Sequence, residues 1–426
     1  MNSLLRIPYA FAGRAANAIA RLVPPGDSKF RRGLNARRDL IDRYQRWSST
    51  SRYPKNPLIW FHAPSVGEGL QASPVIDLVR ARRPDVQIAY TFYSPSAEGF
   101  ASSLHADFAD YLPFDTFAAA DAMIAALRPS ALVFSKLDIW PALTERVTAA
   151  AIPVGVISGT LTESSARRSV LARALLGDAY RSISMVGAID EKDATHFREL
   201  GVRDERIRVT GDTRYDQVSE RAQRPASSLV SSLRSSRPTL VAGSTWPSDQ
   251  THLFAAWARI REKIPDARLV IAPHELTAAH IRAITSWAQR LGLTLSTVDA
   301  RDAVNADIIL VDRFGVLGDL YSLAEVAYVG GAFHAAGLHS VLEPAAFGVP
   351  VLFGPRHENS RDAVKLVAAG GGASVSGEAD LTLRLREWLG SLPARDAAGA
   401  AARSMVQDGT GAAERSFALV SALLDR

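Results

Sequence analysis

The chain of 426 residues has an ordinary globular composition, 47% hydrophobic and 22% charged, and its length predicts two or three domains. It contains no cysteine, which excludes disulfides, thiolate catalysis and cysteine metal sites, and its nine histidines show no HExxH-type ligand spacing. Neither a Walker loop nor a GxGxxG motif occurs.

The positive charge is concentrated at the start of the chain. The whole chain has a net charge of +5, while residues 1–50 alone carry ten Lys or Arg against three Asp, a net of +7. The remaining chain is slightly acidic, since 5 minus 7 leaves −2. A basic excess this local argues against a general nucleic-acid groove, so we predict no nucleic-acid partner.

The first residues predict an amphipathic helix. At 100° per residue, one broad face carries Leu4, Ile7, Phe11, Ala15, Ala18, Ile19 and Leu22. Arg6, Arg14 and Arg21 lie beside this face and interrupt the segment too often for a bilayer span or a signal peptide. Residues 1–50 therefore predict a basic membrane-associating segment on an anionic membrane surface. The alternative is that this helix packs on the protein's own core.

From residue 57 onward, short apolar strands recur with helices between them. The strands are expected at 58–62, 86–91, 131–135, 153–158, 185–189, 207–211, 239–243, 268–272, 293–297, 308–311, 326–329 and 349–353. This alternation is typical of α/β proteins whose parallel sheets are covered on both faces. A stretch rich in Ser, Arg and Pro interrupts it. The predicted organisation is a Rossmann-like domain at 51–218, a linker at 219–238, a second Rossmann-like domain at 239–405 and a C-terminal helix at 406–426.

A glycine-bearing stretch from Val329 to Gly354 reads as strand, loop, helix and strand. Backbone amides at a strand-to-helix junction can bind a phosphate, and glycine allows its close approach. The stretch therefore predicts a nucleotide or sugar-phosphate ligand, with Glu343 placed to bind a ribose or sugar hydroxyl. The alternative is that the glycines only make turns and Glu343 only caps a helix.

Polar side chains follow several of the expected strands. They lie in HAPSVGE at 62–68, at Asp138 and Trp140, in GDTRYD at 211–216, and at 243–245, 273–275 and 312–316. Ligands of open parallel sheets bind beyond the carboxyl ends of the strands. These groups would supply a carboxylate for proton removal and an anion-binding rim, which group transfer from an activated donor requires.

In this order, the motifs resemble those of the bacterial 3-deoxy-D-manno-octulosonic acid (Kdo) transferases. The motifs are HAPSVGEG, DIWPAL, GDTRYD, AGST, PHE, VDRFGVLGDLY, the block from VGGAF to LEPA, and FGP followed by Asn359. The resemblance spans residues from about 30 to 424. It implies a GT-B fold, in which two Rossmann-like domains face each other across a cleft, and a membrane-associating N-terminal segment.

The resemblance also implies an enzyme, a glycosyltransferase of lipopolysaccharide biosynthesis. Such an enzyme moves Kdo from CMP-Kdo to the lipid A precursor (lipid IVA), releases CMP, and works at the cytoplasmic face of the inner membrane. CMP-Kdo is the donor substrate, and no cofactor or metal is expected. How many Kdo units are added, the acceptor's acyl pattern and the oligomeric state are not predicted.

The family's functional residues fall on identifiable positions of this chain. Glu68 matches the general base, and Asp138 and Arg214 match the two charge-stabilising positions. The positions that match CMP-binding residues are Pro273, His274, Phe314, Gly315, Val316, Ser340, Val341, Leu342 and Glu343.

Four of these positions depart from the residues that many family members have. An arginine is common where His274 stands, a glutamate at Val316 and at Asp138, and an asparagine at Ser340. His274 can donate a hydrogen bond to a phosphate, but an imidazole is only partly charged at neutral pH. We interpret these departures as variation within a branch of the family.

Three rival functions remain open at this point. The first is another GT-B glycosyltransferase with a UDP-linked donor, because a fold does not determine the donor. The second is a degenerate membrane-associated binding protein, against which the intact Glu68, Arg214 and Glu343 count. A non-hydrolysing sugar-nucleotide epimerase shares the architecture but has no need for the basic N-terminal segment.

Overall fold

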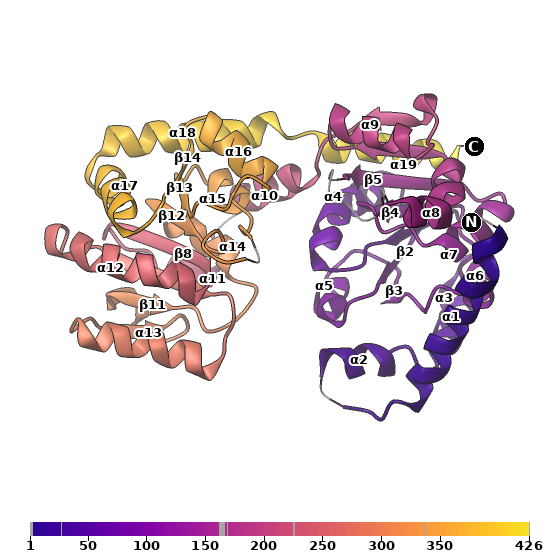
Figure 1. Ribbon diagram of the computed structural model, residues 1–426, viewed down its shortest axis with the longest axis horizontal. Coiled ribbons are helices and arrows are strands. Elements are labelled where there is room, and N and C mark those ends of the chain that lie inside the picture. The colour runs from indigo at the N-terminus through magenta and orange to yellow at the C-terminus, as the bar shows by residue number, and fades with distance from the viewer. Residues whose placement is uncertain are drawn as a thin grey trace. The chain divides into compact units, whose positions relative to one another are not determined.

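The computed structural model describes residues 3–26, 28–161, 167, 169–224, 226–335 and 337–425. The chain forms two compact units (Figure 1): Met1–Gln217 together with Thr410–Arg426, and Val218–Gly409. Each unit is built on one seven-stranded sheet, and all the strand pairs in both sheets are parallel. The predicted α/β class is therefore confirmed.

The sheet of the first unit has the order β3-β2-β1-β4-β5-β6-β7. Its strands are β1 (Leu58–His62), β2 (Gln87–Phe92), β3 (Phe108–Tyr111), β4 (Ala131–Ser135), β5 (Val154–Gly159), β6 (Met185–Ala188) and β7 (Ile207–Val209). Every residue of β1, β2, β4 and β5 is buried, as expected for parallel strands covered on both faces.

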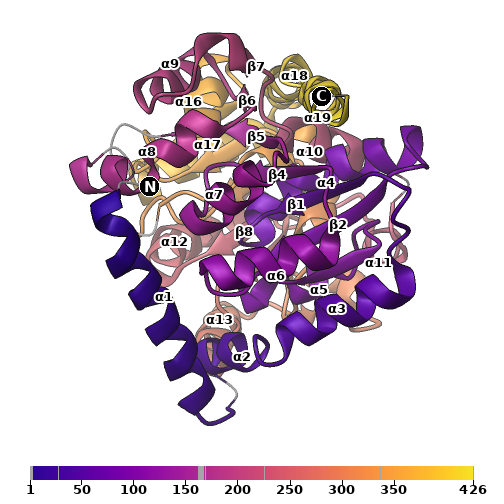
Figure 2. The same cartoon turned by 90° about the vertical axis from the view of Figure 1, so that its right-hand side faces the viewer.

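The helices of this unit cover the sheet or lie at its edges. They are α1 (Ser3–Leu22), α2 (Lys29–Asn35), α3 (Leu40–Ser51), α4 (Val66–Arg82), α5 (Glu98–Ala101), α6 (Phe117–Leu127), α7 (Pro141–Ala149), α8 (Val170–Ser182), α9 (Glu191–Glu199), α19 (Ala412–Leu424) and the start of α10 (Arg214–Gln223), which continues into the second unit. Helices α3, α6, α7 and α8 pack in a row, with α6 and α7 in front of the strands in Figure 2. Helix α4 packs against α19.

Helix α19 returns the end of the chain to the first unit. Leu419, Val420 and Leu423 are buried in its core, and a Cβ on Gly155 of β5 would lie only 2.5 Å from the Leu423 side chain. Asp216 of α10 accepts hydrogen bonds from the amides of Gly411 (2.7 Å) and Ala413 (3.0 Å). The sequence predicts this helix but not the unit that it completes.

Helix α3 belongs to the body of the first unit, although the predicted membrane-associating segment extends to residue 50. Tyr44 is fully buried, and its hydroxyl donates to the Tyr111 carbonyl at 2.9 Å. Arg43 forms a two-bond pair with Asp110, at 2.7 and 2.9 Å. Removal of all 50 residues would therefore open the core, so tests of the segment must target α1.

Helix α1 is attached to the unit by one side and exposes another. The Tyr9 hydroxyl donates to Asp115 Oδ2 at 2.6 Å, and Arg6 pairs with Glu145 at 2.8 Å. The exposed fractions are 79% for Ile7, 73% for Phe11, 59% for Ile19 and 82% for Leu22. The side chain of Leu4 lies outside the described part of the chain. Figures 1 and 2 both show α1 along an edge of the unit.

The sheet of the second unit has the order β10-β11-β9-β8-β12-β13-β14. Its strands are β8 (Thr239–Thr245), β9 (Arg268–Pro273), β10 (Leu295–Thr297), β11 (Ile308–Leu310), β12 (Val326–Val329), β13 (Val351–Phe353) and β14 (Gly372–Ser374). Its helices are α11 (Ser228–Ser232), α12 (Pro247–Lys263), α13 (Ala278–Arg290), α14 (Leu317–Leu320), α15 (Leu342–Ala346), α16 (Arg361–Ala368), α17 (Glu378–Gly390) and α18 (Leu392–Asp408).

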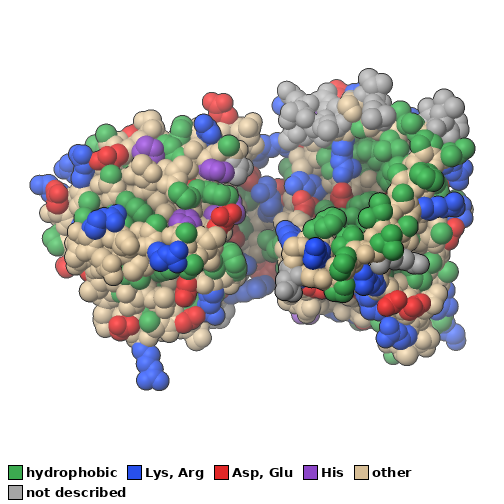
Figure 3. All heavy atoms as spheres, turned by 60° about the horizontal axis from the view of Figure 1, so that its bottom comes forward, with side chains coloured by type: hydrophobic (Ala, Val, Ile, Leu, Met, Phe, Trp, Pro, Cys, Tyr) green, Lys and Arg blue, Asp and Glu red, His purple; other side chains and the backbone are tan. Residues whose placement is uncertain are grey.

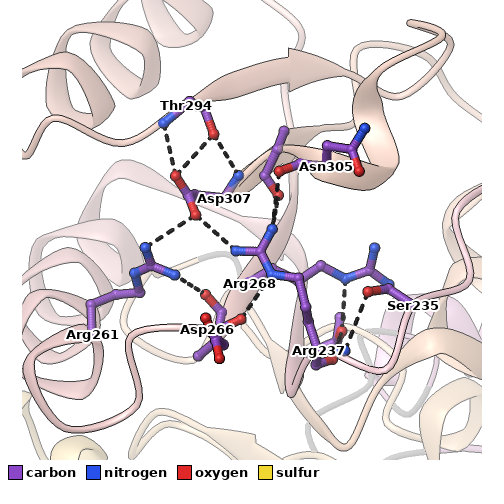
Figure 4. A network of polar contacts seen from close by, with 11 residues as sticks. Ser235, Arg237, Arg261, Asp266, Arg268, Thr294, Asn305 and Asp307 are labelled. Atoms are coloured by element: carbon purple, nitrogen blue, oxygen red, sulfur yellow. Dashed lines mark hydrogen bonds and ion pairs between the residues drawn. The ribbon is translucent and has the colours of Figure 1, made fainter.

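A polar network fastens the amino ends of these strands (Figure 4). Asp307, just before β11, accepts from Arg237 at 2.7 Å and from the Thr294 hydroxyl at 2.9 Å, and pairs with Arg261 at 3.0 Å. Burial opposes the ionisation of Asp307, but the hydrogen bonds from Thr294 and Arg237 outweigh it, so the pKa of this carboxyl is lowered. The amino edge of the sheet is thus occupied by structural contacts.

Each predicted strand is present, and two strands were missed. The missed strand β3 is partly exposed and has no apolar run, and β14 has only three small residues. The predicted linker at 219–238 contains the end of α10 and the whole of α11, and the second unit already begins at Val218. Among the residues that the structure describes, no helix is both long and apolar enough to cross a membrane.

Candidate functional site

Glu68 lies in the first turn of α4, directly beyond the carboxyl end of β1. Its Oε1 accepts a hydrogen bond from Lys136 Nζ at 3.2 Å, and its Oε2 accepts from the Ser65 hydroxyl. The Ser135 hydroxyl donates to the backbone carbonyl of Glu68 at 2.8 Å. Residues that follow two adjacent strands, β1 and β4, therefore hold this carboxylate in one orientation.

These contacts keep Glu68 ionised. Burial raises the pKa of its carboxyl, but the hydrogen bond from Ser65 and the positive charge of Lys136 outweigh burial, and the net shift is downward. Lys136 adopts a left-handed backbone conformation with φ of +67°, which costs a non-glycine residue about 1–3 kcal/mol. The sequence places Lys136 at the end of a strand but gives no sign that it pairs with Glu68.

Asp138 lies in a cluster after β4. It accepts from Trp140 Nε1 at 2.9 Å, pairs with Arg167 at 3.0 Å, and lies 3.4 Å from Nε2 of the buried His62 ring. Burial raises the pKa of this carboxyl, but the hydrogen bond and charge of His62 and the charge of Arg167 produce a net lowering. Arg167 was missed, because a single arginine in a stretch rich in Ser and Arg carries no positional signal.

Arg214, the first residue of α10, is bound to Asp212. Its Nε and Nη2 donate to Asp212 Oδ2 at 2.9 and 2.6 Å. Gln71, one turn beyond Glu68 on α4, donates to the other oxygen of Asp212 at 3.1 Å and accepts from the Thr213 hydroxyl through its carbonyl at 2.6 Å. The GDTRYD motif is thereby joined to the helix that carries Glu68, and Asp212 compensates part of the Arg214 charge.

The predicted nucleotide positions lie in loops after β9, β11 and β12 of the second unit. Pro273 ends β9 and is buried, and Ser340 is exposed before α15. Phe314 is 75% exposed, beside Gly315 and Val316 in the loop before α14. Val341 and Leu342 are fully buried, so neither side chain is exposed to a ligand.

Glu343 is half-buried and faces a cation from the predicted linker. Its Oε1 lies 3.6 Å from Arg221 Nη1, and Arg221 is also 3.8 Å from Asp319 Oδ1. Burial raises the pKa of the Glu343 carboxyl, Arg221 opposes this shift, and Asp319 adds to it. Sequence reasoning missed Arg221, because its spacing from Glu343 carries no local pattern.

The glycine amides predicted to bind a phosphate are used by the protein itself. Asp249 accepts from Gly331 N at 2.9 Å and from Phe333 N at 3.4 Å, and Gly330 N donates to the Gly243 carbonyl at 2.9 Å. Gly331 has φ of +103°, and helix α15 has only five residues. The prediction that the Gly330 and Gly331 amides are free for a ligand is therefore wrong. The alternative, in which these glycines only make turns, agrees with the structure.

Asp249 is the centre of this loop. It is fully buried, and it also accepts hydrogen bonds from Trp246 N at 2.8 Å and from the Tyr328 hydroxyl at 3.1 Å. One carboxylate thereby fixes the residues that follow β8 to those that follow β12. Among the residues that the structure describes, no group of His, Asp and Glu side chains could hold a metal ion.

Comparison with known proteins supports the predicted resemblance. Residues 38–217 match the family model described as 3-deoxy-D-manno-octulosonic-acid transferase (kdotransferase). The 3-deoxy-D-manno-octulosonic acid transferase of Haemophilus influenzae is 26% identical over 395 residues, which are 92% of each chain. The protein of the same name from Chlamydophila psittaci is 29% identical over 328 residues, 75% of this chain and 74% of that protein. The chain is thus similar to Kdo transferases over most of its length, and the family model matches within its first unit.

The predicted family and the predicted enzyme class, a glycosyltransferase, are thereby confirmed. The fold of this chain is also similar to that of solved nucleotide-sugar enzymes. The UDP-GlcNAc 2-epimerase from Neisseria meningitidis bound to UDP-GlcNAc is 14% identical, with a TM-score of 0.60 over 87% of this chain and 100% of that chain. At this identity the likeness concerns the fold alone, and it agrees with the predicted GT-B class.

Proposed function

We propose that this protein is a Kdo transferase, which moves Kdo from CMP-Kdo to the lipid A precursor, lipid IVA, and releases CMP in lipopolysaccharide biosynthesis. The observation that carries the proposal is the oriented, ionised carboxylate of Glu68 beyond the carboxyl end of β1. It is supported by the similarity to Kdo transferases, and by a second set of polar residues that follow the strands of the other unit.

In the proposed reaction, the primary hydroxyl of the acceptor's glucosamine attacks the anomeric carbon of Kdo. A new carbon–oxygen bond forms, the bond between Kdo and the phosphate breaks, and its electron pair leaves with CMP. The hydroxyl proton passes to Glu68, which acts as general base. Asp138 and Arg214 stabilise the charges that develop, and CMP-Kdo enters as a substrate without a further cofactor.

A transfer assay tests donor and acceptor together. Radiolabelled tetraacyl lipid A precursor is incubated with CMP-Kdo or with UDP-sugars, and products are resolved by the number of sugars added. Product from CMP-Kdo alone is expected, and it also counts the Kdo units. Product from a UDP-sugar alone would overturn the donor, and the absence of product with every donor would favour a degenerate binding protein.

We expect Glu343→Ala to weaken CMP binding. A charged group that accepts a hydrogen bond contributes about 1.5–3 kcal/mol, so a carboxylate that holds the ribose gives roughly a tenfold to hundredfold loss of affinity. Calorimetry with CMP measures it. The control is Glu378→Ala, a first-turn glutamate of α17 that pairs with Arg259 instead. Equal CMP affinity of the Glu343 variant and the control would remove Glu343 from the nucleotide site.

We further propose that α1 attaches the enzyme to the anionic cytoplasmic face of the inner membrane. Its exposed apolar side chains, Ile7, Phe11 and Ile19, would enter the interface, and the exposed Arg14 would face the lipid headgroups. Figure 3 shows a stretch of apolar side chains, in green, on the surface of the first unit.

The triple variant Ile7→Glu, Phe11→Glu, Ile19→Glu is expected to lose vesicle binding. The variant loses the favourable transfer of three apolar side chains from water into the membrane interface. Its partition coefficient onto phosphatidylglycerol vesicles should therefore fall by more than about tenfold. Co-sedimentation measures it. Leu383→Glu, at a similarly exposed leucine of α17, is the control. Unchanged binding of the triple variant would exclude α1 as the attachment site.

A further inference from the structure

Three histidines gather around Trp246 at the carboxyl edge of the second unit's sheet. The ring of His334 stacks on Trp246 with centroids 4.1 Å apart, and the ring of His274 stacks on it at 4.4 Å. His274 also stacks on His339 at 4.5 Å. These residues follow β8, β9 and β12, and histidines (purple) come to the surface of this unit close together in Figure 3.

The rings of this cluster lie close enough together for a charge on one to affect its neighbours. Like charges at stacking distance disfavour one another, while the face of a tryptophan stabilises a cation that lies on it. Trp246 Nε1 donates to Nε2 of His339 at 3.2 Å, so this nitrogen is an acceptor and His339 is neutral. Burial, and then the neighbouring His274, lower the pKa of His339, although Asp249 opposes this.

Within the described part of the chain, no carboxylate forms a hydrogen bond or ion pair with the His274 ring. Asp249 of α12 is the buried acid nearby, and its oxygens are occupied by the amides of Trp246 and Gly331 and by the Tyr328 hydroxyl. Other charged or titratable residues on the elements around the cluster are His252 of α12, Glu275 next to His274 in the sequence, His280 of α13, and Arg356, whose amide donates to the Ala332 carbonyl. His252 contacts Phe333, and His280 bonds Gln250 and the Glu275 carbonyl.

We propose that His274 is a proton-linked anion contact, so that a phosphate-bearing ligand binds this loop cluster together with a proton. The inference rests on the proposed function, in that the ligand is the phosphate of a cytidine nucleotide. An arginine at this position would bind the same anion at any pH, whereas an imidazole binds it strongly only when protonated. The stacking on Trp246 and His339 holds the ring where the loops after β8, β9 and β12 meet. Donor affinity therefore rises as the pH falls from 8 toward 6.

Calorimetry of the full chain with CMP, in buffers of different ionisation heats at pH 6, 7 and 8, tests the proposal. At pH 8 the CMP phosphate is already dianionic, because such a group titrates at about pH 6. Proton uptake at pH 8 therefore belongs to the protein. We expect uptake and an affinity that rises by up to about tenfold per pH unit on acidification. CMP binding without any proton uptake would overturn the proposal. This test uses the unmodified protein and requires no variant.

Variants assign the proton to His274. His274→Arg is expected to bind CMP with little pH dependence beyond that of CMP itself, and His274→Gln to bind weakly throughout. His252→Gln, which changes a neighbouring histidine on α12, should keep the wild-type slope. A wild-type slope in His274→Arg would overturn the assignment to this residue.

A second probe separates this inference from the proposed function. Inorganic phosphate that binds with proton uptake, while CMP binds no more tightly than phosphate, would support the anion contact and overturn the nucleotide donor. If CMP binds much more tightly than phosphate but without proton uptake, the nucleotide donor is supported and the proton-linked anion contact is overturned. Binding of neither probe would overturn both.

Discussion

Replacement of Glu68 by Gln is expected to lower the Kdo transfer rate by about two to four orders of magnitude, the range for loss of a general base. Glutamine keeps the size of the side chain and can still bond Ser65, but it cannot take a proton from the acceptor. The turnover number with CMP-Kdo and the lipid A precursor measures the loss. Glu191→Gln, at an exposed first-turn glutamate of α9 in the same unit, is the matched control and should retain activity.

The pH profile gives a second readout of the same carboxylate. Because the folded-state pKa of Glu68 lies below its usual value of 4.5, the active ionised form is present above that value and is lost only as pH falls through the lowered pKa. Lys136→Gln removes one of the lowering interactions, so the acid limb of activity should move to higher pH. Near-normal turnover of Glu68→Gln, or an unmoved limb in Lys136→Gln, would contradict the assigned base.

Asp249→Ala is expected to destabilise the second unit by about 3 kcal/mol or more. The substitution leaves the amides of Trp246 and Gly331 and the Tyr328 hydroxyl without their acceptor, and each buried donor left unpaired costs about 1–3 kcal/mol. Urea unfolding followed by tryptophan fluorescence measures the change. Asp299→Ala, at an exposed carboxylate that pairs with Arg313, is the control and should change stability little.

Hydrogen exchange distinguishes a local effect from a global one. The Gly331 and Phe333 amides, which donate to Asp249, should exchange much faster in the Asp249→Ala variant, even under conditions where the sheet remains protected. Wild-type stability together with wild-type exchange at these amides would show that Asp249 does not organise the loop.

The strands and Glu68 could be predicted because their signals are local. A short apolar run of β-branched and aromatic residues, such as Leu58–His62, specifies a buried strand, and a carboxylate just after it falls at the edge where ligands bind. Strand β14 has only Gly372, Ala373 and Ser374, and its pairing with β13 comes from the sheet around it. Its sequence alone carries no strand signal.

The contacts that complete the site could not be predicted because they join residues far apart in the chain. Asp249 meets Gly331 across 82 positions, and Lys136 meets Glu68 across 68. The Gly-Gly pattern at 330–331 is compatible both with a phosphate-binding loop and with a turn. Only the hydrogen bond from the Gly331 amide to Asp249 distinguishes the two. Likewise, Arg221 of α10 pairs with Glu343 of α15, a residue far along the chain.

The return of α19 to the first unit has a consequence for biosynthesis. Leu419, Val420 and Leu423 fill the core beside β5, so the first unit lacks part of its interior until the second unit has been synthesised. A ribosome that adds about 5–20 residues per second needs roughly 10–40 seconds for the intervening 192 residues, from Val218 to Gly409. During that interval the apolar residues that α19 later covers stay exposed, and transiently exposed apolar surface of this kind is prone to aggregate.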